Sequence, residues 1–292
     1  MIIVAQKMGL LGNMLEQYAH LIAFSKEHGV PISQMGFSDY AAHFTEPSRD
    51  LFCRYPCGRT LITGAWARKI AFKLLLILGR LNLLRLIPGA TVVTMDWKGG
   101  AFDLSDPAFI ALAKSRKLVF LRGGWQHRYW TAYEKHIGTI RDFFKVAEPH
   151  ASNVRALAEK VRGAGGDVSI GVHLRQGDLR FDPVRKDFFT TAQYISVMQK
   201  AVALFPGKKV TFLICSDVPQ NPADFAEFTV FYGTGHLVED MYSLAECDYI
   251  IGTRVTSFSG WASMMGNKPM YRLVDAEADF SLADFTVLLR QP

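Results

Sequence analysis

Short apolar runs alternate with segments of helical spacing along this chain of 292 residues, and the alternation predicts an α/β protein with parallel sheets. Six runs are strand candidates, namely residues 1–5, 92–95, 117–121, 168–173, 210–215 and 248–251. Residues 153–162 and 191–204 have the apolar spacing of amphipathic helices. With no internal repeat to relate them, the two halves of the chain are predicted to be dissimilar, doubly wound, Rossmann-like domains.

The chain opens with a strand, a glycine loop and a helix. Residues 1–5 are apolar, Gly9 and Gly12 follow, and apolar side chains then recur at helical spacing from Leu15 to Ala23. Further along, residues 163–167 read Gly-Ala-Gly-Gly-Asp between a predicted helix and a predicted strand. We place the domain boundary there, which gives an N-terminal domain of residues 1–165 and a C-terminal domain of residues 166–292.

The composition excludes several classes of protein. With 49% hydrophobic and 21% charged residues the chain is not disordered, and four cysteines cannot form a disulfide framework. The N-terminus does not resemble a secretory signal, so we expect a cytoplasmic protein with reduced thiols. Cys53 and Cys57 lack a second ligand pair with zinc spacing, and His127, His136, His150 and His236 form no motif, so no metal is expected.

The net charge of +6 comes from one stretch of the chain. Residues 51–95 contain no acidic residue and seven basic ones, which are Arg54, Arg59, Arg68, Lys69, Lys73, Arg80 and Arg85. The other 247 residues therefore hold 26 basic and 27 acidic side chains. Because basic and aromatic residues are not interleaved along a predicted sheet, we do not expect the protein to bind nucleic acid.

The same stretch contains an amphipathic helix. Residues 70–87 are the most apolar part of the chain, but charged and polar residues interrupt them before the roughly 20 residues needed to span a membrane. On a helical wheel Lys69, Lys73 and Arg80 fall within about 40° of one another. Two interpretations stay open: a core helix with a solvated cationic edge, or peripheral contact with an anionic membrane through residues 66–87, at its inner face.

Two motifs lie at the predicted carboxyl ends of strands, where open α/β sheets bind ligands. In the first, Gly9, Gly12 and Asn13 precede a helix whose free N–H groups suit an anion, although plain turns have the same pattern. In the second, His173 and Arg175 share one strand face, and an arginine there can hold a phosphate bidentately. The alternative pairs Arg175 with Asp178 and makes His173 a core residue.

Two further motifs follow later strands. Asp217 comes directly after the run 210–215 and suits the hydroxyls or ring N–H of a nucleotide, or else caps a turn. Ser257, Phe258 and Ser259 follow the run 248–251 and can cradle a phosphate and a sugar, or else cap and pack the next helix.

In this order the motifs resemble those of the bacterial α-1,2-fucosyltransferases of glycosyltransferase family 11. Residues 8–19 are similar to the family's opening G-G-L-G-N-Q-M-F-Q-Y-A loop, and residues 173–178 (H-L-R-Q-G-D) to its H-I-R-R-G-D. Residues 212–217 look like its F-x-x-F-S-D-D, and residues 239–262 like its closing D-L-x-L-M-S-x-C and S-T-F-S-W-W-G-A blocks. The resemblance covers most of the chain outside residues 35–115.

The resemblance implies a GT-B architecture, in which two Rossmann-like domains face a cleft. It also implies an inverting, metal-independent transfer of L-fucose from GDP-fucose to a glycan hydroxyl, as in a galactoside 2-α-L-fucosyltransferase. The acceptor implied is a repeat unit of a surface polysaccharide such as O-antigen or capsule, carried on a lipid. These implications make the chain an enzyme of polysaccharide biosynthesis.

The resemblance also suggests roles for the motif residues. Arg175 is expected at the β-phosphate, with Ser257, Phe258 and Ser259 completing the cradle. Asp217 is expected at the guanine or ribose, His173 as an orienting residue, and Gly9, Gly12 and Asn13 across the cleft. The catalytic candidates are Arg175, Glu16 as a base, and Asp178, which fits a partner of the loop better than a base. Glu16 is alternatively a structural or surface residue.

The chain departs from the family pattern on the donor side. Gln176 replaces the second arginine of the H-x-R-R-G-D motif, and Leu179, Val218 and Gly260 replace other motif residues. Two alternatives to a fucosyltransferase therefore remain: a transferase using another nucleotide sugar on the same fold, and a nucleotide- or glycan-binding module without turnover.

Overall fold

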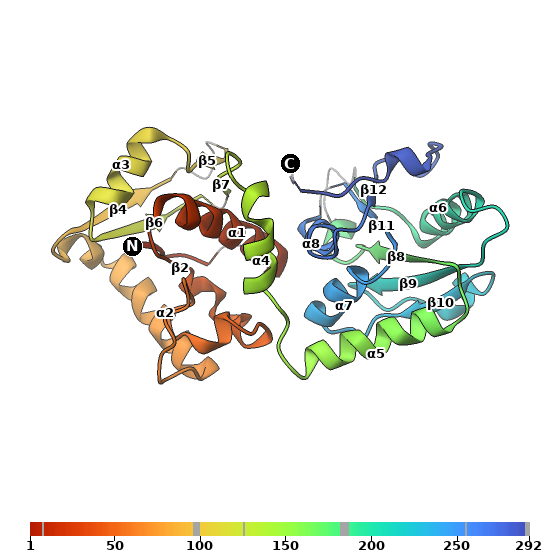
Figure 1. Ribbon diagram of the computed structural model, residues 1–292, viewed down its shortest axis with the longest axis horizontal. Coiled ribbons are helices and arrows are strands. Elements are labelled where there is room, and N and C mark those ends of the chain that lie inside the picture. The colour runs from red at the N-terminus through yellow and green to blue at the C-terminus, as the bar shows by residue number, and fades with distance from the viewer. Residues whose placement is uncertain (8, 96–99, 125, 182–186, 255, 290–292) are drawn as a thin grey trace. The chain divides into compact units, whose positions relative to one another are not determined.

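The chain divides into two compact units, Met1–Ala147 and Glu148–Pro292, each described here by itself (Figure 1). The computed structural model describes residues 1–7, 9–95, 100–124, 126–181, 187–254 and 256–289. Each unit contains a five-stranded, mainly parallel sheet with helices packed on it, so the predicted α/β class is confirmed.

The first unit is built on a sheet of strand order β3-β2-β1-β6-β4, in which only β2 and β3 run antiparallel. A second, two-stranded sheet pairs β5 with β7. The elements are β1 (Ile2–Val4), α1 (Leu11–His28), β2 (Ile32–Ser33), β3 (Arg54–Tyr55), α2 (Ala65–Arg80), β4 (Ala90–Thr94), β5 (Phe102–Asp103), α3 (Pro107–Ser115), β6 (Leu118–Arg122), β7 (His127–Arg128) and α4 (Ile137–Phe143).

The second unit is built on an all-parallel sheet of strand order β10-β9-β8-β11-β12. Its elements are α5 (His150–Gly163), β8 (Val168–Leu174), α6 (Thr191–Ala203), β9 (Val210–Ser216), β10 (Thr229–Tyr232), α7 (Leu237–Leu244), β11 (Tyr249–Thr253), α8 (Ser257–Gly266) and β12 (Met270–Leu273). The strands β10 and β12 lie at the sheet edges and were not among the predicted runs.

The central strand β8 is buried on both faces, as expected of a parallel strand between two helix layers. Val168, Ile170, Val172 and Leu174 face the apolar cluster that includes α6. On the other face, a Cβ added to Gly171 would lie 2.7 Å from Leu244 of α7, so only glycine allows this helix to approach. Packing on both faces thus fixes the position of the carboxyl end of β8, where the second predicted motif begins.

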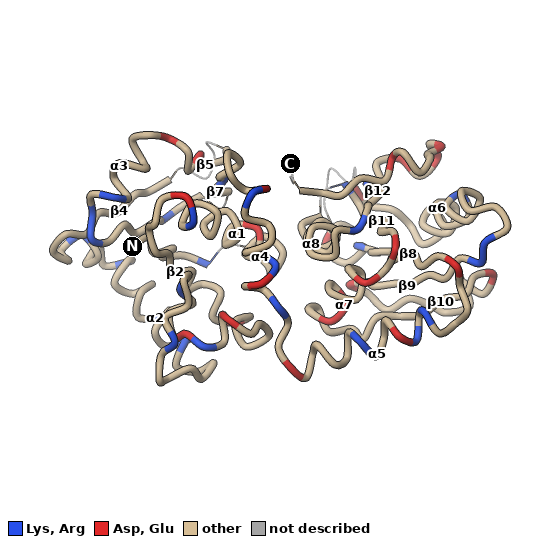
Figure 2. Tube along the Cα trace, viewed as in Figure 1, with Lys and Arg blue, Asp and Glu red and all other residues tan. Residues whose placement is uncertain are grey.

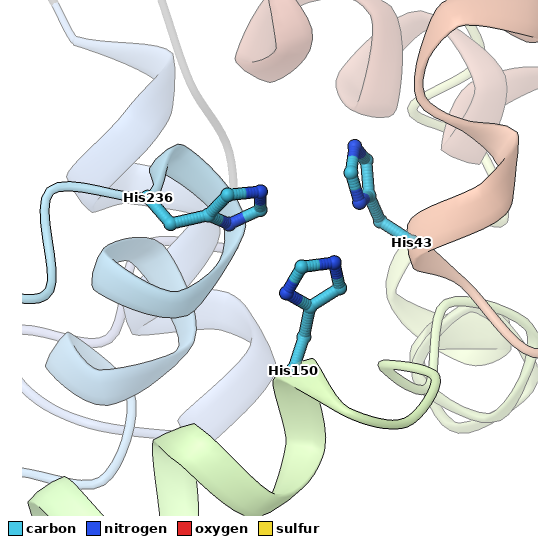
Figure 3. A group of neighbouring side chains, drawn as sticks. All are labelled: His43, His150 and His236. Carbon is cyan, nitrogen blue, oxygen red and sulfur yellow. The ribbon is translucent and has the colours of Figure 1, made fainter.

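The division between the units falls earlier than residues 165/166, the boundary predicted from the glycine-rich turn. It lies between Ala147 and Glu148, so α5 belongs wholly to the second unit. At the start of α5, the ring of His150 stacks on that of His236 at 4.2 Å between centroids (Figure 3). The His150 Nδ1 and the Asn153 Nδ2 lie 2.7 and 2.8 Å from the Glu239 Oε1. These contacts bind α5 to α7, and the glycine-rich turn is an ordinary helix-to-strand connection.

The predicted amphipathic helix is α2, which begins after Gly64 and ends at Arg80, before Asn82 takes a left-handed conformation at φ 57°. None of the helices formed by the described residues is both long and apolar enough to cross a membrane. The cysteines Cys53, Cys57, Cys215 and Cys247 form no disulfide with one another in the structure.

Candidate functional site

Arg175 lies immediately beyond the carboxyl end of β8 and is paired with Asp178. Its Nε and Nη2 donate to the two carboxylate oxygens of Asp178 at 3.1 and 2.7 Å, which is a bidentate geometry. This hydrogen bonding raises the pKa of Arg175 and lowers that of Asp178. The side chain of Arg175 is 28% exposed, so its charge is oriented by Asp178 and still reaches solvent.

Asp217 fixes the backbone of the Arg175 loop. Its Oδ1 accepts from the N–H groups of Gln176 and Gly177 at 2.8 and 3.0 Å, and its Oδ2 accepts from Gly177 at 3.1 Å. A Cβ on Gly177 would lie 3.0 Å from the Asp217 Oδ2, so the glycine allows this close approach. The carboxylate expected to read a guanine or ribose is thus already engaged in positioning the neighbouring strand's loop.

His173 lies within the protein rather than at its surface. It is 5% exposed, and its ring stacks on Phe258 with the ring centroids 4.7 Å apart. Burial, helped by the charge of Arg175, lowers the pKa of His173 to about 3, so the imidazole is neutral at physiological pH. Phe258 is itself half-buried and covers His173, so any effect of the histidine on a ligand acts through this stack.

The helix α8 follows the carboxyl end of β11. Its second residue, Phe258, stacks on His173, two residues before Arg175. Thr256 caps the helix by accepting from the Phe258 N–H at 3.2 Å, and Ser257, half-buried, forms its first turn. Ser259 is fully buried and faces Gly252 of β11, so its hydroxyl points into the unit. The predicted cradle therefore keeps the helix N-terminus, Ser257 and Phe258, and we leave Ser259 out of it.

A second arginine, Arg254, belongs to this site and was not among the predicted residues. The strands β8 and β11 pair in register with His173 opposite Gly252, so Arg175 and Arg254 leave the sheet side by side. Asp187 links them: its Oδ1 lies 3.4 Å from the Arg254 Nε, and its charge also raises the pKa of Arg175. Arg254 could be placed beside Arg175 only once β11 was known to pair with β8. Neither of the two sequence motifs contains that information.

A pocket of about 550 Å³ adjoins the Arg175 loop. Gln176, the residue in place of an arginine, lines it and donates to the Phe189 carbonyl at 3.0 Å. Gln220 donates to the Gln176 Oε1 at 2.8 Å, and Thr191 lies beside them at the start of α6. The pocket wall thus includes side-chain amides that are hydrogen-bonded to each other and to the backbone.

In the first unit, the predicted glycine loop joins β1 to α1. Gly9 has φ +64°, and a Cβ there would meet the Asn13 side chain at 2.6 Å. Gly12 is buried within the first turn of α1, whose N-cap, Leu10, makes no side-chain capping bond. The loop therefore offers backbone N–H groups at a helix N-terminus, as expected, whereas Gly12 contributes to the packing of the helix.

Glu16, the candidate base, is buried in an ion pair. It is 5% exposed, and its Oε1 lies 3.1 Å from the Nη2 of Arg128, which is 6% exposed. Burial raises the pKa of Glu16, and Arg128 partly offsets this effect. Arg128 also lies over the ring of Trp130 at 6.0 Å. These contacts favour the structural interpretation of Glu16 that the sequence left open.

Comparison with known proteins agrees with this description of the chain. The sequence model of glycosyl transferase family 11 matches residues 114–280, more than half of the chain. Among curated proteins, none matches the chain in sequence. The match begins before β6 and extends beyond β12, so it includes the whole Arg175 site.

Three solved structures illustrate the similarity of fold. A mutant of Arabidopsis thaliana FUT1 in complex with GDP has a TM-score of 0.57 and 14% identity, covering 98% of this chain and 73% of that one. Fucosyltransferase NodZ from Bradyrhizobium has a TM-score of 0.56 and 19% identity, covering 93% and 95%. POFUT1 in complex with GDP-fucose has a TM-score of 0.54 and 12% identity, covering 91% and 94%.

At these identities the structures establish the fold, which is of the GT-B type that the sequence predicted. The family is established by the sequence model, which includes both cationic strand ends of the second unit. The chain therefore belongs to glycosyltransferase family 11.

Proposed function

We propose that this glycosyltransferase is an inverting α-1,2-fucosyltransferase that moves L-fucose from GDP-fucose to a hydroxyl group of a glycan. Membership of family 11 and the order of the sequence motifs support the transfer reaction. Structures of the same fold were determined with GDP or soaked with GDP-fucose, which supports the donor. The acceptor we propose is a lipid-linked repeat unit of a surface polysaccharide.

The chemistry requires stabilisation of a departing diphosphate. When the bond between fucose and GDP breaks, negative charge develops on the β-phosphate, and a fixed cation there lowers the barrier. We assign Arg175 to this phosphate and Arg254 to the second cation, with the N–H groups at the start of α8 completing the site. Asp178 and Asp217 position Arg175 and its loop. In this proposal no metal takes part.

The single observation that carries the proposal is the arginine pair at the ends of β8 and β11, whose side chains bond to the carboxylates of Asp178 and Asp187. The pocket next to Gln176 supports a place for the nucleoside, because it adjoins the Arg175 loop. In this proposal Asp217 has a positioning role, because its carboxylate holds the backbone of the Arg175 loop.

The experiment is a thermal-shift panel with GDP, GDP-fucose, GDP-mannose, UDP and CMP on three proteins. A ligand that binds only the folded state raises stability by RT ln(1 + [L]/Kd), which is about 2.7 kcal/mol at a hundred times Kd. We expect shifts with GDP and GDP-fucose for the wild type, and their loss in Arg175→Ala. Arg162→Ala removes the same charge from α5, where the side chain is 56% exposed, and is expected to keep the shifts.

Turnover separates the proposed function from its alternatives. We expect GDP release from GDP-fucose to rise when a galactose-terminated acceptor is added and to be unchanged by EDTA. A shift with UDP or CMP alone contradicts the guanine donor and indicates another nucleotide sugar. GDP binding without release under any acceptor indicates a binding module. Normal binding and turnover by Arg175→Ala contradict the site itself.

A further inference from the structure

The outer face of α2 and of the short helical turn Leu83–Leu86 is an unusually apolar surface, which we call the α2 face. Trp66 is 77% exposed, Leu74 56%, Ile77 50%, Leu81 62% and Leu86 74%. A contiguous patch of large, exposed apolar side chains marks an interaction site for a protein, a ligand or a membrane.

The opposite side of α2 is fixed in the first unit. Phe72 and Leu75 are each 7% exposed and belong to an apolar cluster that includes Phe120 of β6. Arg68, 3% exposed, donates from its Nη2 to the Ser48 carbonyl and from its Nε to the Asp50 carbonyl at 3.3 Å. The helix is therefore docked by one side, and the apolar side chains of the α2 face cannot turn inward without dismantling this packing.

The cations of the stretch border the apolar side chains. At 3.6 residues per turn, Lys73 falls about 100° and Arg80 about 120° from Leu74, and both fall about 80° or more from the buried side at Phe72 and Leu75. Lys69 lies in the same strip and pairs with Asp39 at 3.4 Å, so we give it no part. Arg85, also exposed, extends the strip beyond the helix.

The charge of the α2 face has one sign. Residues 51–95 carry no acidic side chain, whereas α5 of the second unit carries both signs (Figure 2). Arg54 bonds to the Asp50 carboxylate, Arg68 bonds to the Asp50 carbonyl, and Lys69 pairs with Asp39. The remaining cations of the stretch are exposed, namely Arg59, Lys73, Arg80 and Arg85. An apolar strip bordered by cations matches the boundary between the acyl chains and the anionic headgroups of a bilayer.

We propose that the α2 face docks the protein on an anionic lipid surface, with α2 lying in the plane of the interface. Trp66, Leu74 and Ile77 enter the boundary of the acyl chains, while Lys73 and Arg80 contact the headgroups. The binding is peripheral, and it is independent of the donor site because it uses only residues of the first unit. It adds to the proposed function a means of reaching an acceptor held in a membrane.

The test is sedimentation of the full chain with vesicles of phosphatidylcholine, either alone or with about 30% phosphatidylglycerol. Each neutralised cation is expected to weaken binding to the anionic vesicles about fivefold, so Lys73→Gln, Arg80→Gln and Arg85→Gln together weaken it about a hundredfold. The control is Lys26→Gln, Lys114→Gln and Arg116→Gln, which removes the same charge from exposed positions of the same unit. Equal binding by the two triple variants overturns the proposal.

A second arm tests the apolar contribution and the competing occupant. Trp66→Ser and Leu74→Ser are expected to weaken vesicle binding about tenfold each, because the buried apolar area is lost. Raising the salt concentration is expected to weaken the wild type and to have little effect on the triple variant. Equal binding to vesicles with and without phosphatidylglycerol contradicts docking on an anionic surface and overturns the proposal. A dimer in sedimentation velocity that Leu74→Ser dissociates, without vesicle binding, assigns the face to a second copy of the chain and also overturns the proposal.

Discussion

Replacing His173 by glutamine is expected to remove a pH-dependent part of the stability of the second unit. The imidazole is 5% exposed and stacked on Phe258, and its pKa falls from 6.5 to about 3 through burial and the charge of Arg175. The folded state therefore holds a neutral ring at a pH where the unfolded chain binds a proton. Glutamine is polar and does not titrate, so it keeps the neutral state in both folded and unfolded chains.

The sign and size follow from proton linkage. Because the folded pKa is lowered, the stability contributed by the neutral ring is present above about pH 6.5 and is lost as the pH falls towards about 3. Between about pH 7 and about pH 5 the unfolded state gains about 2 kcal/mol relative to the folded state from this residue alone. His127 in the first unit, whose pKa burial also lowers to about 3, is expected to act in the same way there.

The assay is urea unfolding of the full chain at the two pH values, followed by the fluorescence of Trp261, the only tryptophan of residues 148–292. To isolate that signal, the other tryptophans are replaced by phenylalanine in both proteins. The stability difference between the two pH values is expected to be about 2 kcal/mol smaller in His173→Gln than in the parent. Equal pH dependence in the two proteins refutes the buried, neutral histidine.

Three further predictions concern single contacts. Glu16→Gln is expected to lower the free energy of unfolding by about 3 kcal/mol in calorimetry, because it leaves the buried Arg128 uncompensated; unchanged stability with lost turnover assigns Glu16 to catalysis instead. Gly177→Ala is expected to weaken GDP binding about tenfold in titration calorimetry, since its Cβ meets Asp217 at 3.0 Å and displaces the loop; normal affinity contradicts that role. Arg254→Gln is expected to weaken GDP binding about tenfold and to reduce its salt dependence, and an effect equal to that of Arg162→Gln contradicts a direct phosphate contact.

The central strands of both sheets could be predicted because parallel strands covered on two faces have continuous apolar sequences. The runs at residues 168–173 and 210–215 became β8 and β9 with changes of one residue at their ends. The edge strands β10 and β12 are only four residues long, and the exposed Arg272 interrupts the apolar run of β12. The domain boundary was misplaced because a glycine-rich turn has the same composition whether it links two domains or two elements of one domain.

From the sequence we could predict at which strand ends the candidate site lies. The direction and contacts of each side chain could not be predicted. Arg175 and Asp178 lie where the motif indicated, because a motif after a buried strand must emerge at the sheet edge. Sequence alone could not tell whether the Asp217 carboxylate faces a ligand or the adjacent loop, since that depends on the register between β8 and β9. In the same way, only the packing of α8 on β11 decides that Ser259 points inward.

The replacement of an arginine by Gln176 looks different once the strand order is known. Within the motif, this replacement removes a positive charge from the proposed phosphate site. Counted along the sheet edge, Arg254 of the adjoining strand brings a second cation to the same place, held by Asp187. A dianionic leaving group responds to the charge near its oxygens rather than to the chain position of that charge. The proposed site therefore has two arginines, while Gln176 lines the neighbouring pocket and bonds to the Phe189 carbonyl and to Gln220.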